Sequence, residues 1–313
     1  MNKEMDKKKI IKFVVITYII AWALQIPASI YSLKNPGMAG TTVFRYVVAI
    51  SMYAPLLAAL ILNKTLKGMG WKPRLKGNGN VRWIFWSILI PAVAVILGAA
   101  VFYAIYPDLF DSTAESYLIK QGEELGVDML GQLESKGISP VLYTGVVAVS
   151  SITYAGFINM FFAVGEEAGW RGFLYKELRK GFGRVSTWII GGVIWAAFHF
   201  PIMLIAGYEY GKDYLGAPVL GPVVFTINCI VMGVLLEIVY DKTKCIWFPA
   251  LFHGVFNAIA NLPLFYWNMN IEKKANSLMI LGPAANGIIG MIPMVITAVI
   301  MAVIVIRSEK KSE

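Results

Sequence analysis

The sequence predicts an all-α polytopic membrane protein. Of its 313 residues 58% are hydrophobic, and the mean hydropathy is +0.64, whereas soluble domains carry about 45–50% apolar residues. A helix needs roughly 20 apolar residues to cross about 30 Å of hydrocarbon. Eight stretches of that kind occur, near residues 10–32, 42–63, 81–106, 140–164, 185–206, 218–240, 245–265 and 279–306.

The first stretch follows the basic leader MNKEMDKKK. It is too long for the apolar part of a signal peptide and has no small-residue cleavage site, so we expect a retained helix. The next two stretches are joined by a basic, glycine-rich connection, NKTLKGMGWKPRLKGNGN. No residue pattern in residues 1–106 indicates chemistry.

The net charge of +9 does not indicate a nucleic-acid partner, because the basic residues are spread over short connections between apolar stretches instead of along one face. With the N-terminus in the cytoplasm, 21 of the 28 Lys and Arg residues fall on the cytoplasmic side. Cytoplasmic connections carry this excess, and an even number of spans returns the C-terminus to the same side. We therefore predict a multi-pass integral membrane protein with both termini cytoplasmic, and the Lys-rich, Ile-rich composition suggests a prokaryotic cell membrane.

We expect two regions. Residues 1–139 hold spans one to three and an outer segment, residues 107–139, in which Leu, Ile and Val recur at helical spacing among acids. This segment predicts one or two surface helices, as a solvated connector in preference to a lid. Residues 140–313 hold spans four to eight. They also hold three short groups of polar residues within apolar stretches, here called polar islands, and these suggest a catalytic core.

The first polar island, GEEAGWRG, closes the fourth stretch. Ionisable groups at membrane depth cost about 2.5–3.5 kcal/mol each on insertion scales and mark functional sites by default. Glu167 and Arg171 are four residues apart, so on a helix they face each other as an ion pair. Glu166 points about 100° away and is free for another task. The alternative is a charge cluster that anchors the helix end.

The second island is His199 in WAAFHFP, near the middle of the fifth stretch. An imidazole in hydrocarbon needs a hydrogen-bond partner, and we expect a carboxylate to supply it. Trp195 lies one helical turn earlier on the same face and is expected to wall the pocket. The alternative is a histidine that only packs.

The third island, FHGVFN, places His253 and Asn257 one turn apart on one face of the seventh stretch. Two hydrogen-bonding groups arranged in this way can stabilise one oxyanion from two directions. They could also join helices, a contact worth about 0.6 kcal/mol on average. Glu237 and Asp241, near the inner end of the sixth stretch, are expected to snorkel to the membrane surface or to pair structurally, with a supporting role of Glu237 at the site as an alternative.

A carboxylate and a neutral imidazole can together take a proton from water, while two donors stabilise the oxygen that becomes negative. No serine elbow and no cysteine beside a histidine motif supports a covalent nucleophile. Cys229 and Cys245 indicate neither a disulfide framework nor a CxxC site. We expect no cofactor. Zinc stays an alternative, although there is no HExxH motif.

These residues carry a resemblance. E-E-A-G-W-R at 166–171, W-A-A-F-H at 195–199 and H-G-V-F-N at 253–257 resemble the EExxxR, (F/W)xxxH and HxxxN motifs of the CAAX prenyl endopeptidase and bacteriocin-processing family, the type II CAAX protease or Abi group. The order and spacing agree, and the resemblance covers about residues 140–262. The first 139 residues resemble the family only in hydropathy.

The resemblance implies an intramembrane glutamate-type endopeptidase acting on a peptide or lipidated peptide. By motif position, Glu166 and His199 would activate water, and His253 and Asn257 would form the oxyanion site. Glu167 and Arg171 would hold the first motif in shape or contact the substrate. Eukaryotic relatives trim the residues after a prenylated cysteine, whereas many bacterial relatives act on other peptides.

Two other classes of function stay open. A non-catalytic immunity or scaffold protein would bind a peptide or a membrane partner with the same side chains. A proton-coupled transporter would need polar groups that reach both membrane faces, and the outer ends of spans five to eight show no such chain of charges. The protease is the favoured hypothesis.

Overall fold

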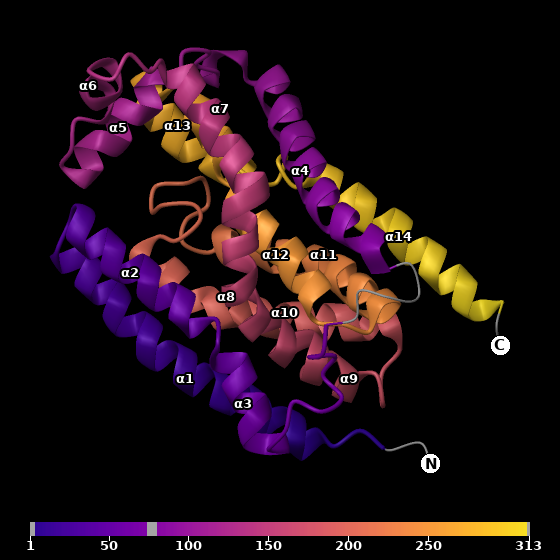
Figure 1. The fold of residues 1–313 in the computed structure, drawn as a ribbon. Coiled ribbons are helices and arrows are strands. Elements are labelled where there is room, and N and C mark those ends of the chain that lie inside the picture. The colour runs from indigo at the N-terminus through magenta and orange to yellow at the C-terminus, as the bar shows by residue number, and fades with distance from the viewer. Residues whose placement is uncertain (1–3, 74–79, 312–313) are drawn as a thin grey trace.

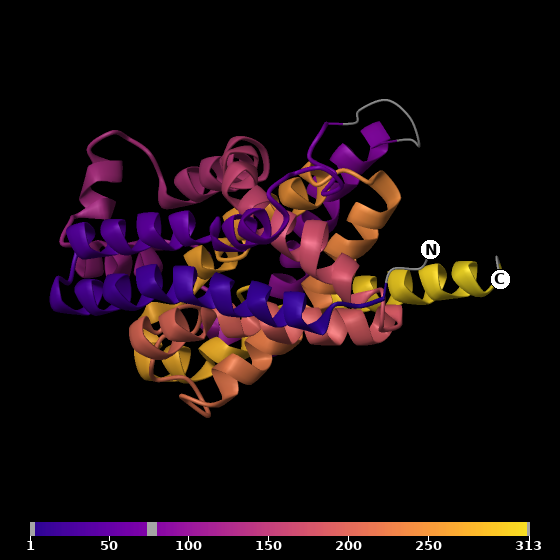
Figure 2. The same ribbon diagram turned by 90° about the horizontal axis from the view of Figure 1, so that it is seen from below.

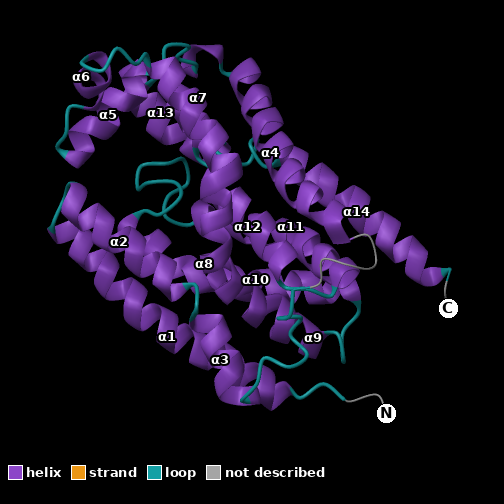
Figure 3. Ribbon diagram, in the orientation of Figure 1, coloured by secondary structure: helices purple, strands orange, loops and turns teal. Residues whose placement is uncertain are grey.

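The computed structural model describes residues 4–73 and 80–311. In chain order its α-helices are α1 (Lys7–Lys34), α2 (Met38–Ser51), α3 (Ala54–Asn63), α4 (Asn80–Ile105), α5 (Glu115–Leu125), α6 (Met129–Glu134), α7 (Pro140–Ser150), α8 (Gly156–Gly169), α9 (Tyr175–Leu178), α10 (Arg184–Ala206), α11 (Leu220–Thr243), α12 (Trp247–Ile259), α13 (Glu272–Leu278) and α14 (Ile292–Lys310). Helices dominate the drawn chain (Figure 3), and the described residues contain no β-strand, only an isolated bridge between Phe110 and Trp267. The predicted all-α class is confirmed.

Eight helical segments are long enough and apolar enough to cross a membrane, as the sequence predicted. They are Lys7–Lys34, Met38–Asn63, Val81–Ile105, Pro140–Leu178, Arg184–Ala206, Leu220–Thr243, Trp247–Tyr266 and Ile292–Lys310. Large apolar side chains on the outer helices are exposed, for example Ile19 on α1, Ile96 on α4 and Ile304 on α14. An apolar exterior of this kind is what contact with lipid requires. The chain is a multi-pass integral membrane protein.

The helices are arranged around α11 and α12, which are the most buried spans. Figure 1 shows the α1–α3 hairpin on one side and α4 with α14 on the other, with α8, α10, α11 and α12 between them. Within the hairpin, α1 and α2 run side by side (Figure 2), in agreement with their contacts. The short helices α5, α6 and α13 gather at one end of the molecule, and both termini lie toward the other (Figure 1).

Glycines allow α12 to approach α8 more closely than any other residue would. A Cβ atom at Gly254 would lie 2.4 Å from the Met160 backbone nitrogen and 2.7 Å from the Gly156 carbonyl oxygen. A Cβ atom at Gly156 would lie 2.7 Å from a Val255 methyl group. This contact between backbones brings the second half of α8, with its two glutamates, beside α12, which carries His253.

We expect Gly254→Ala to destabilise the protein by about 1–3 kcal/mol, because the added methyl group forces α8 and α12 apart. Gly145→Ala is the matched control: Gly145 also lies in a helix, but a Cβ atom there meets nothing within 4 Å. The control should be neutral or slightly stabilising, since alanine favours helix more than glycine does. Thermal unfolding in detergent measures both. Equal losses in the two variants would contradict the close packing.

The fourth span is longer than predicted, and its polar island lies inside it instead of at its end. The helix continues from Pro140 to Leu178 through π-helical turns at Ser151–Ala155 and Trp170–Leu174. The predicted end at residue 164 was wrong because charged residues end a span only where water must solvate them. Here protein partners satisfy them, as described below. Such π turns are frequent at functional sites.

The last span is shorter than the predicted stretch 279–306. A 3₁₀ turn at Met279–Leu281 and an irregular segment come first, and α14 begins only at Ile292. Gly282, with a φ of 119°, precedes Pro283, and this glycine-proline pair breaks the helix despite its apolar neighbours. Hydropathy alone therefore placed the start of this span too early.

The outer segment 107–139 contains two short helices, α5 and α6, as predicted. The division at residue 139 stays a prediction, as does the side of the membrane on which each end lies. Of the basic residues in the predicted charge pattern, Lys3, Arg74 and Lys76 lie outside the described residues.

Candidate active site

A buried chain of three side chains links the first motif to the third. Arg171 Nη1 donates to Glu167 Oε1 at 2.8 Å, and His253 Nδ1 lies 2.9 Å from the same oxygen. Glu167 and Arg171 are completely buried, and His253 is 4% exposed. The ion pair predicted from the four-residue spacing is confirmed. Only the structure shows that Glu167 also holds the His253 ring in place.

Glu166 is held by two tryptophans. Its Oε2 atom accepts hydrogen bonds from Trp170 Nε1 at 3.0 Å and from Trp195 Nε1 at 2.5 Å. Trp195 was predicted as a pocket wall and is in addition a donor to the carboxylate. Trp170 was missed, although it stands four residues after Glu166 and this spacing was a usable signal. Oε1 of Glu166 has no hydrogen bond to any described side chain, so it is the oxygen available to a ligand.

His199 hydrogen-bonds along its own helix. Its Nδ1 atom lies 3.0 Å from the Trp195 carbonyl oxygen, whereas the sequence predicted a carboxylate partner. A carboxylate is nevertheless near, since Glu166 and His253 both act electrostatically on this ring. The His199 ring packs edge-on against Phe225, with 5.1 Å between centroids. The prediction failed because a backbone carbonyl one helical turn earlier, that of Trp195, already satisfies Nδ1 of His199.

The indole of Trp195 lies at the centre of this arrangement. Its ring centroid is 5.3 Å from that of His253 and 6.5 Å from that of His199. The Arg171 guanidinium stacks on it, with Cζ 4.3 Å from the centroid. Trp195, the first residue of the second motif, thus packs against His253 of the third motif and bonds to Glu166 of the first. The structure brings Glu166, His199 and His253 together around one indole ring.

Asn257 is placed differently. It is exposed, and it makes no hydrogen bond with a residue that the structure describes. It lies one helical turn after His253 on α12. A role for Asn257 in the site stays a prediction.

The glycines of the first motif fix the position of α8. A Cβ atom at Gly165 would lie 2.7 Å from the Met52 carbonyl oxygen, and one at Gly169 would lie 2.2 Å from the Pro55 Cβ atom. The first contact is with the bend between α2 and α3, and the second is with the first turn of α3. The two glutamates between these glycines are thereby directed toward α10 and α12.

Glu237 and Asp241 pair structurally, as predicted. Arg184 donates to Glu237 at 2.8 Å, to Asp241 at 3.1 Å and to Glu309 at 2.6 Å. Trp188 Nε1 adds a bond of 3.1 Å to Glu237. This cluster ties the start of α10 to the ends of α11 and α14.

A second polar cluster, which sequence reasoning missed, begins where α10 ends. Glu209 has a left-handed backbone, with a φ of 76°. Asn286 Nδ2 and the Tyr208 hydroxyl donate to its carboxyl group, and Asn228 Nδ2 donates to Asn286 Oδ1 at 2.8 Å. The signal was weak, because these residues come from three separate segments.

Burial raises the pKa of Glu209 from 4.5 to about 7, although hydrogen bonds from Asn286 and Tyr208 oppose the shift. Between these values the folded protein binds a proton that the unfolded chain has released, so stability falls as the pH rises from about 4.5 to 7 and then levels off. Glu209→Gln should remove this fall. The thermal midpoints of both proteins, measured in detergent across that pH range, test the expectation. Parallel pH curves would contradict it.

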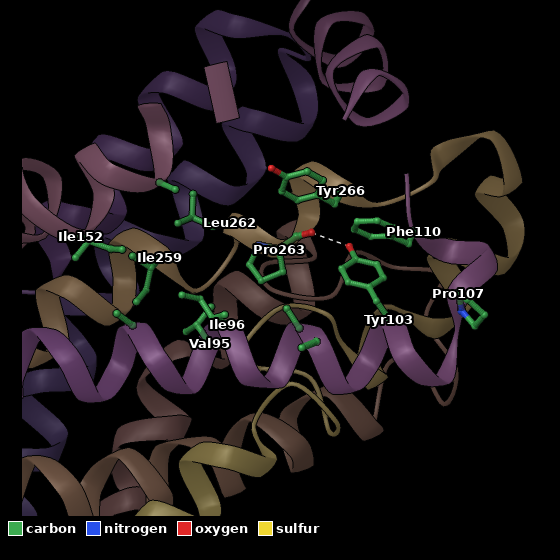
Figure 4. A pocket seen from close by; sticks show the side chains of 14 residues that line it. Val95, Ile96, Tyr103, Pro107, Phe110, Ile152, Ile259, Leu262, Pro263 and Tyr266 are labelled. Carbon is green, nitrogen blue, oxygen red and sulfur yellow. Dashed lines mark hydrogen bonds between the residues drawn. The ribbon is translucent and has the colours of Figure 1, made fainter. Parts of the chain in front are cut away.

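An apolar pocket of about 490 Å³ opens between α4, α7 and the end of α12. Figure 4 shows Ile96, Ile152, Ile259 and Tyr266 around it, together with the hydrogen bond from the Tyr103 hydroxyl to the Pro263 carbonyl oxygen, which is 2.7 Å long. The two cysteines are free and buried. Within residues 4–73 and 80–311, no group of three His, Cys, Asp or Glu side chains is arranged to hold a metal ion.

Comparisons with known proteins agree with the predicted resemblance. Residues 141–259 match the family model "Type II CAAX prenyl endopeptidase Rce1-like". A protein from Methanococcus maripaludis named "CAAX prenyl protease 2" is 25% identical over 102 residues, which cover 32% of this chain and 37% of that protein. The similarity thus spans little more than a third of the relative's length. The region that contains Glu166, His199, His253 and Asn257 matches the type II CAAX prenyl endopeptidase family, as the three motifs predicted.

Proposed function

We propose that this protein is an intramembrane endopeptidase of the CAAX type, in which Glu166 and His199 activate water and His253 with Asn257 stabilises the oxyanion. The observation that carries the proposal is the state of the two imidazoles. Each is tied through Nδ1, and neither Nε2 atom is hydrogen-bonded to a side chain in the described part of the chain. Both rings therefore keep a nitrogen available for chemistry, and both pack against Trp195, which bonds to Glu166.

For the activation of water, the hydrogen-bond partner of His199 determines which tautomer its ring adopts. A carbonyl oxygen only accepts, so Nδ1 carries the proton and Nε2 of the neutral ring carries a lone pair. Nε2 can then accept a hydrogen bond from water, and the free Oε1 of Glu166 can accept a second one. Two acceptors on one water increase the negative charge on its oxygen and aim it at a carbonyl carbon.

On the oxyanion side, Nδ1 of His253 donates to the Glu167 carboxylate. For Nε2 to donate as well, the ring has to carry both protons, and Glu167 supplies the opposite charge. Arg171 shares that carboxylate and keeps it in position. Asn257, one turn further along α12, would add the second donor from its amide.

The reaction balances with these groups alone. Water loses a proton to Glu166 or His199, and its oxygen bonds to the peptide carbonyl carbon while the carbonyl oxygen becomes negative next to His253. The carbon–nitrogen bond then breaks as the same proton passes to the departing amine. The product carboxylic acid then passes its remaining proton to the same base, which releases it to solvent, and the carboxylate and the amine leave the site. No covalent intermediate with the protein forms.

A peptide or lipidated peptide is the substrate that we propose. The name of the archaeal relative specifies a prenyl protease. In this chain, the apolar pocket of about 490 Å³ is lined by Ile259, which lies on the helix that carries His253 and Asn257. It offers a place for the apolar chain of a lipidated substrate.

Reconstituted protein should cleave peptides near a C-terminal cysteine motif, offered with and without a farnesyl group and followed by mass spectrometry. We expect His199→Gln to lower kcat/KM by about 10²–10⁴-fold, the usual contribution of a general base. Asn257→Ala should lower it by about 10²–10³-fold, as removal of one oxyanion donor does.

The matched control is Asn159→Ala on α8, where the amide donates to the Ala155 carbonyl oxygen one turn earlier and to no other described residue. Its activity should equal that of the wild type. If Asn257→Ala behaves like this control, Asn257 is not part of the oxyanion site. If no peptide of either kind is cleaved by the wild type, the enzymatic proposal fails.

A further inference from the structure

A second pocket, of about 1030 Å³, lies apart from the apolar one. It is formed by the connection after α3, by the helix that carries Arg171 to Arg179, and by the facing ends of α10 and α11. Seven Lys or Arg residues line it, but only two acids, Glu237 and Asp241. Both acids already bond to Arg184. Arg171, Arg179 and Lys244 also have acidic partners, so the excess of positive charge in the pocket comes from Lys67, Lys72 and Lys176.

The basic side chains at its mouth have few acidic partners. Lys67 and Lys72 are exposed, and neither has a salt bridge to a described residue. Lys176 Nζ donates to the Gly68 carbonyl oxygen and lies 4.9 Å from the centroid of the Tyr240 ring. A carbonyl oxygen and an aromatic ring leave this ammonium without an acid to neutralise it. Charge of this kind attracts anions.

The floor of the pocket contains unsatisfied donors. Arg171 is completely buried and Tyr175 is 1% exposed, yet Arg171 Nε and Nη2 and the Tyr175 hydroxyl have no hydrogen-bond partner among the described residues. Nε and Nη2 form one side of the guanidinium fork, the edge that binds an oxyanion through two parallel bonds. Buried donors without partners cost stability, so in a native protein ordered water, an ion or a ligand normally satisfies them.

These donors point to the same place. A Cβ atom built on Gly233 would lie 2.5 Å from the Tyr175 hydroxyl and 3.8 Å from Arg171 Nη2. The absence of a side chain at Gly233 therefore lets the Tyr175 hydroxyl and the Arg171 guanidinium lie side by side against α11. An anion that reached both groups would receive hydrogen bonds from a charged and a neutral donor at once.

The pocket lies at one membrane surface. Its residues come from the connection between spans two and three, from the end of span four with the start of span five, and from the end of span six. In a chain of eight successive spans, these connections all fall on the same side. Trp71 and Tyr240 also line the pocket, and aromatic side chains of this kind are enriched at the level of lipid headgroups.

We propose that this pocket binds a phosphate group, carried by an anionic phospholipid headgroup or by a soluble phosphate. The side-on edge of Arg171 and the Tyr175 hydroxyl hold its oxygens, and Lys176 with the lysines at the mouth balances its charge. A phosphate carries up to two negative charges and three or four acceptor oxygens, which suits this excess of cations better than a single carboxylate does. Basic pockets between membrane helices are suited to anionic headgroups.

The proposed phosphate site is distinct from the proposed catalytic site, but Arg171 links the two. Arg171 bonds through Nη1 to Glu167, which holds His253, while its other edge faces the pocket. The proposal does not depend on peptidase activity. Its test therefore measures binding alone.

The experiment uses the full-length protein in a phosphate-free maltoside detergent. Thermal unfolding is followed while sodium phosphate, dihexanoyl phosphatidylglycerol or dihexanoyl phosphatidylcholine is added, because a ligand of the folded state raises Tm with its concentration. We expect stabilisation by phosphate, by the anionic lipid, or by both, and a weaker effect of the zwitterionic lipid, because the lysines at the mouth repel its choline group. The two active probes separate a soluble source from a lipid source.

Tyr175→Phe is the most informative variant. Its hydroxyl has no partner among the described residues when the pocket holds no ligand, so the variant should unfold at the same temperature as the wild type, or higher, without a probe. With the probe, its Kd should be about tenfold weaker, as expected when one hydrogen bond to a charged group is lost. Lys176→Gln should weaken binding to a similar extent.

Lys180→Gln is the matched control. Lys180 lies close by in sequence and bonds to Glu177, but it does not line the pocket. It should bind every probe as the wild type does. Equal loss in Lys180→Gln and Lys176→Gln would show a general attraction of charge and would overturn the proposal. So would an unchanged affinity in Tyr175→Phe, or no response to either phosphate probe.

One more arm of the experiment tests whether the ligand is a carboxylate. Sodium acetate and a short peptide with a free C-terminus are titrated beside the same peptide with an amidated C-terminus. If the free carboxylate stabilises the protein at lower concentration than phosphate does, and does so through Tyr175, the pocket is a carboxylate site and the phosphate assignment is wrong.

Discussion

Glu166→Gln lowers the rate of peptide hydrolysis by about 10²–10⁴-fold, the usual contribution of general-base catalysis. The amide keeps an oxygen that can accept the hydrogen bonds of Trp170 and Trp195, which hold this side chain at 3.0 and 2.5 Å. It cannot take a proton from water. The loss should therefore appear in kcat, with little change in the thermal midpoint of the purified protein.

Glu177→Gln provides the control for this substitution. Glu177 lies on the same continuous span and loses the same charge, but its partners are Lys9 and Lys180. Its activity should stay at the wild-type level. A Glu166→Gln protein that retains full biological effect would favour the non-catalytic immunity or scaffold hypothesis, since binding needs no base.

Arg171→Met destabilises the protein by about 3–5 kcal/mol, because it leaves a buried carboxylate without its counter-charge. Glu167 is completely buried and bonds to Arg171 at 2.8 Å. The variant also loses the stacking of the guanidinium on Trp195, whose centroid lies 4.3 Å from Cζ. Unfolding in detergent, followed by circular dichroism, measures the change.

The double variant Glu167→Gln/Arg171→Met should regain a large part of this loss, since no buried charge is then left alone. Arg179→Met is the comparison at the surface. Its contact with Glu309 is 3.4 Å long and partly exposed, and pairs of that kind contribute about 0–1 kcal/mol. Equal losses of stability in Arg171→Met and Arg179→Met would contradict the assignment of Arg171 as the buried counter-charge of Glu167.

Much of the fold was predictable because it depends on local chain properties. The length of an apolar run indicates a span wherever it occurs, and seven of the eight predicted stretches begin within a few residues of the observed segments. The exception, at 279–306, failed at Gly282 and Pro283, where backbone conformation outweighs hydropathy. The fourth span failed in the opposite direction, because the prediction ended the span before Glu166, although the partners of this residue lie within the protein.

By itself, the sequence determined the membrane class, the positions of the spans, the Glu167–Arg171 pair and the three motifs, since apolar run length and four-residue spacing are properties of a single helix. Only the tertiary structure decided which partners the motifs take. His253 bonds to Glu167, 86 positions away, and Trp195 bonds to Glu166, 29 positions away. These contacts depend on how closely glycines allow α8, α10 and α12 to pack, and no local pattern encodes that distance.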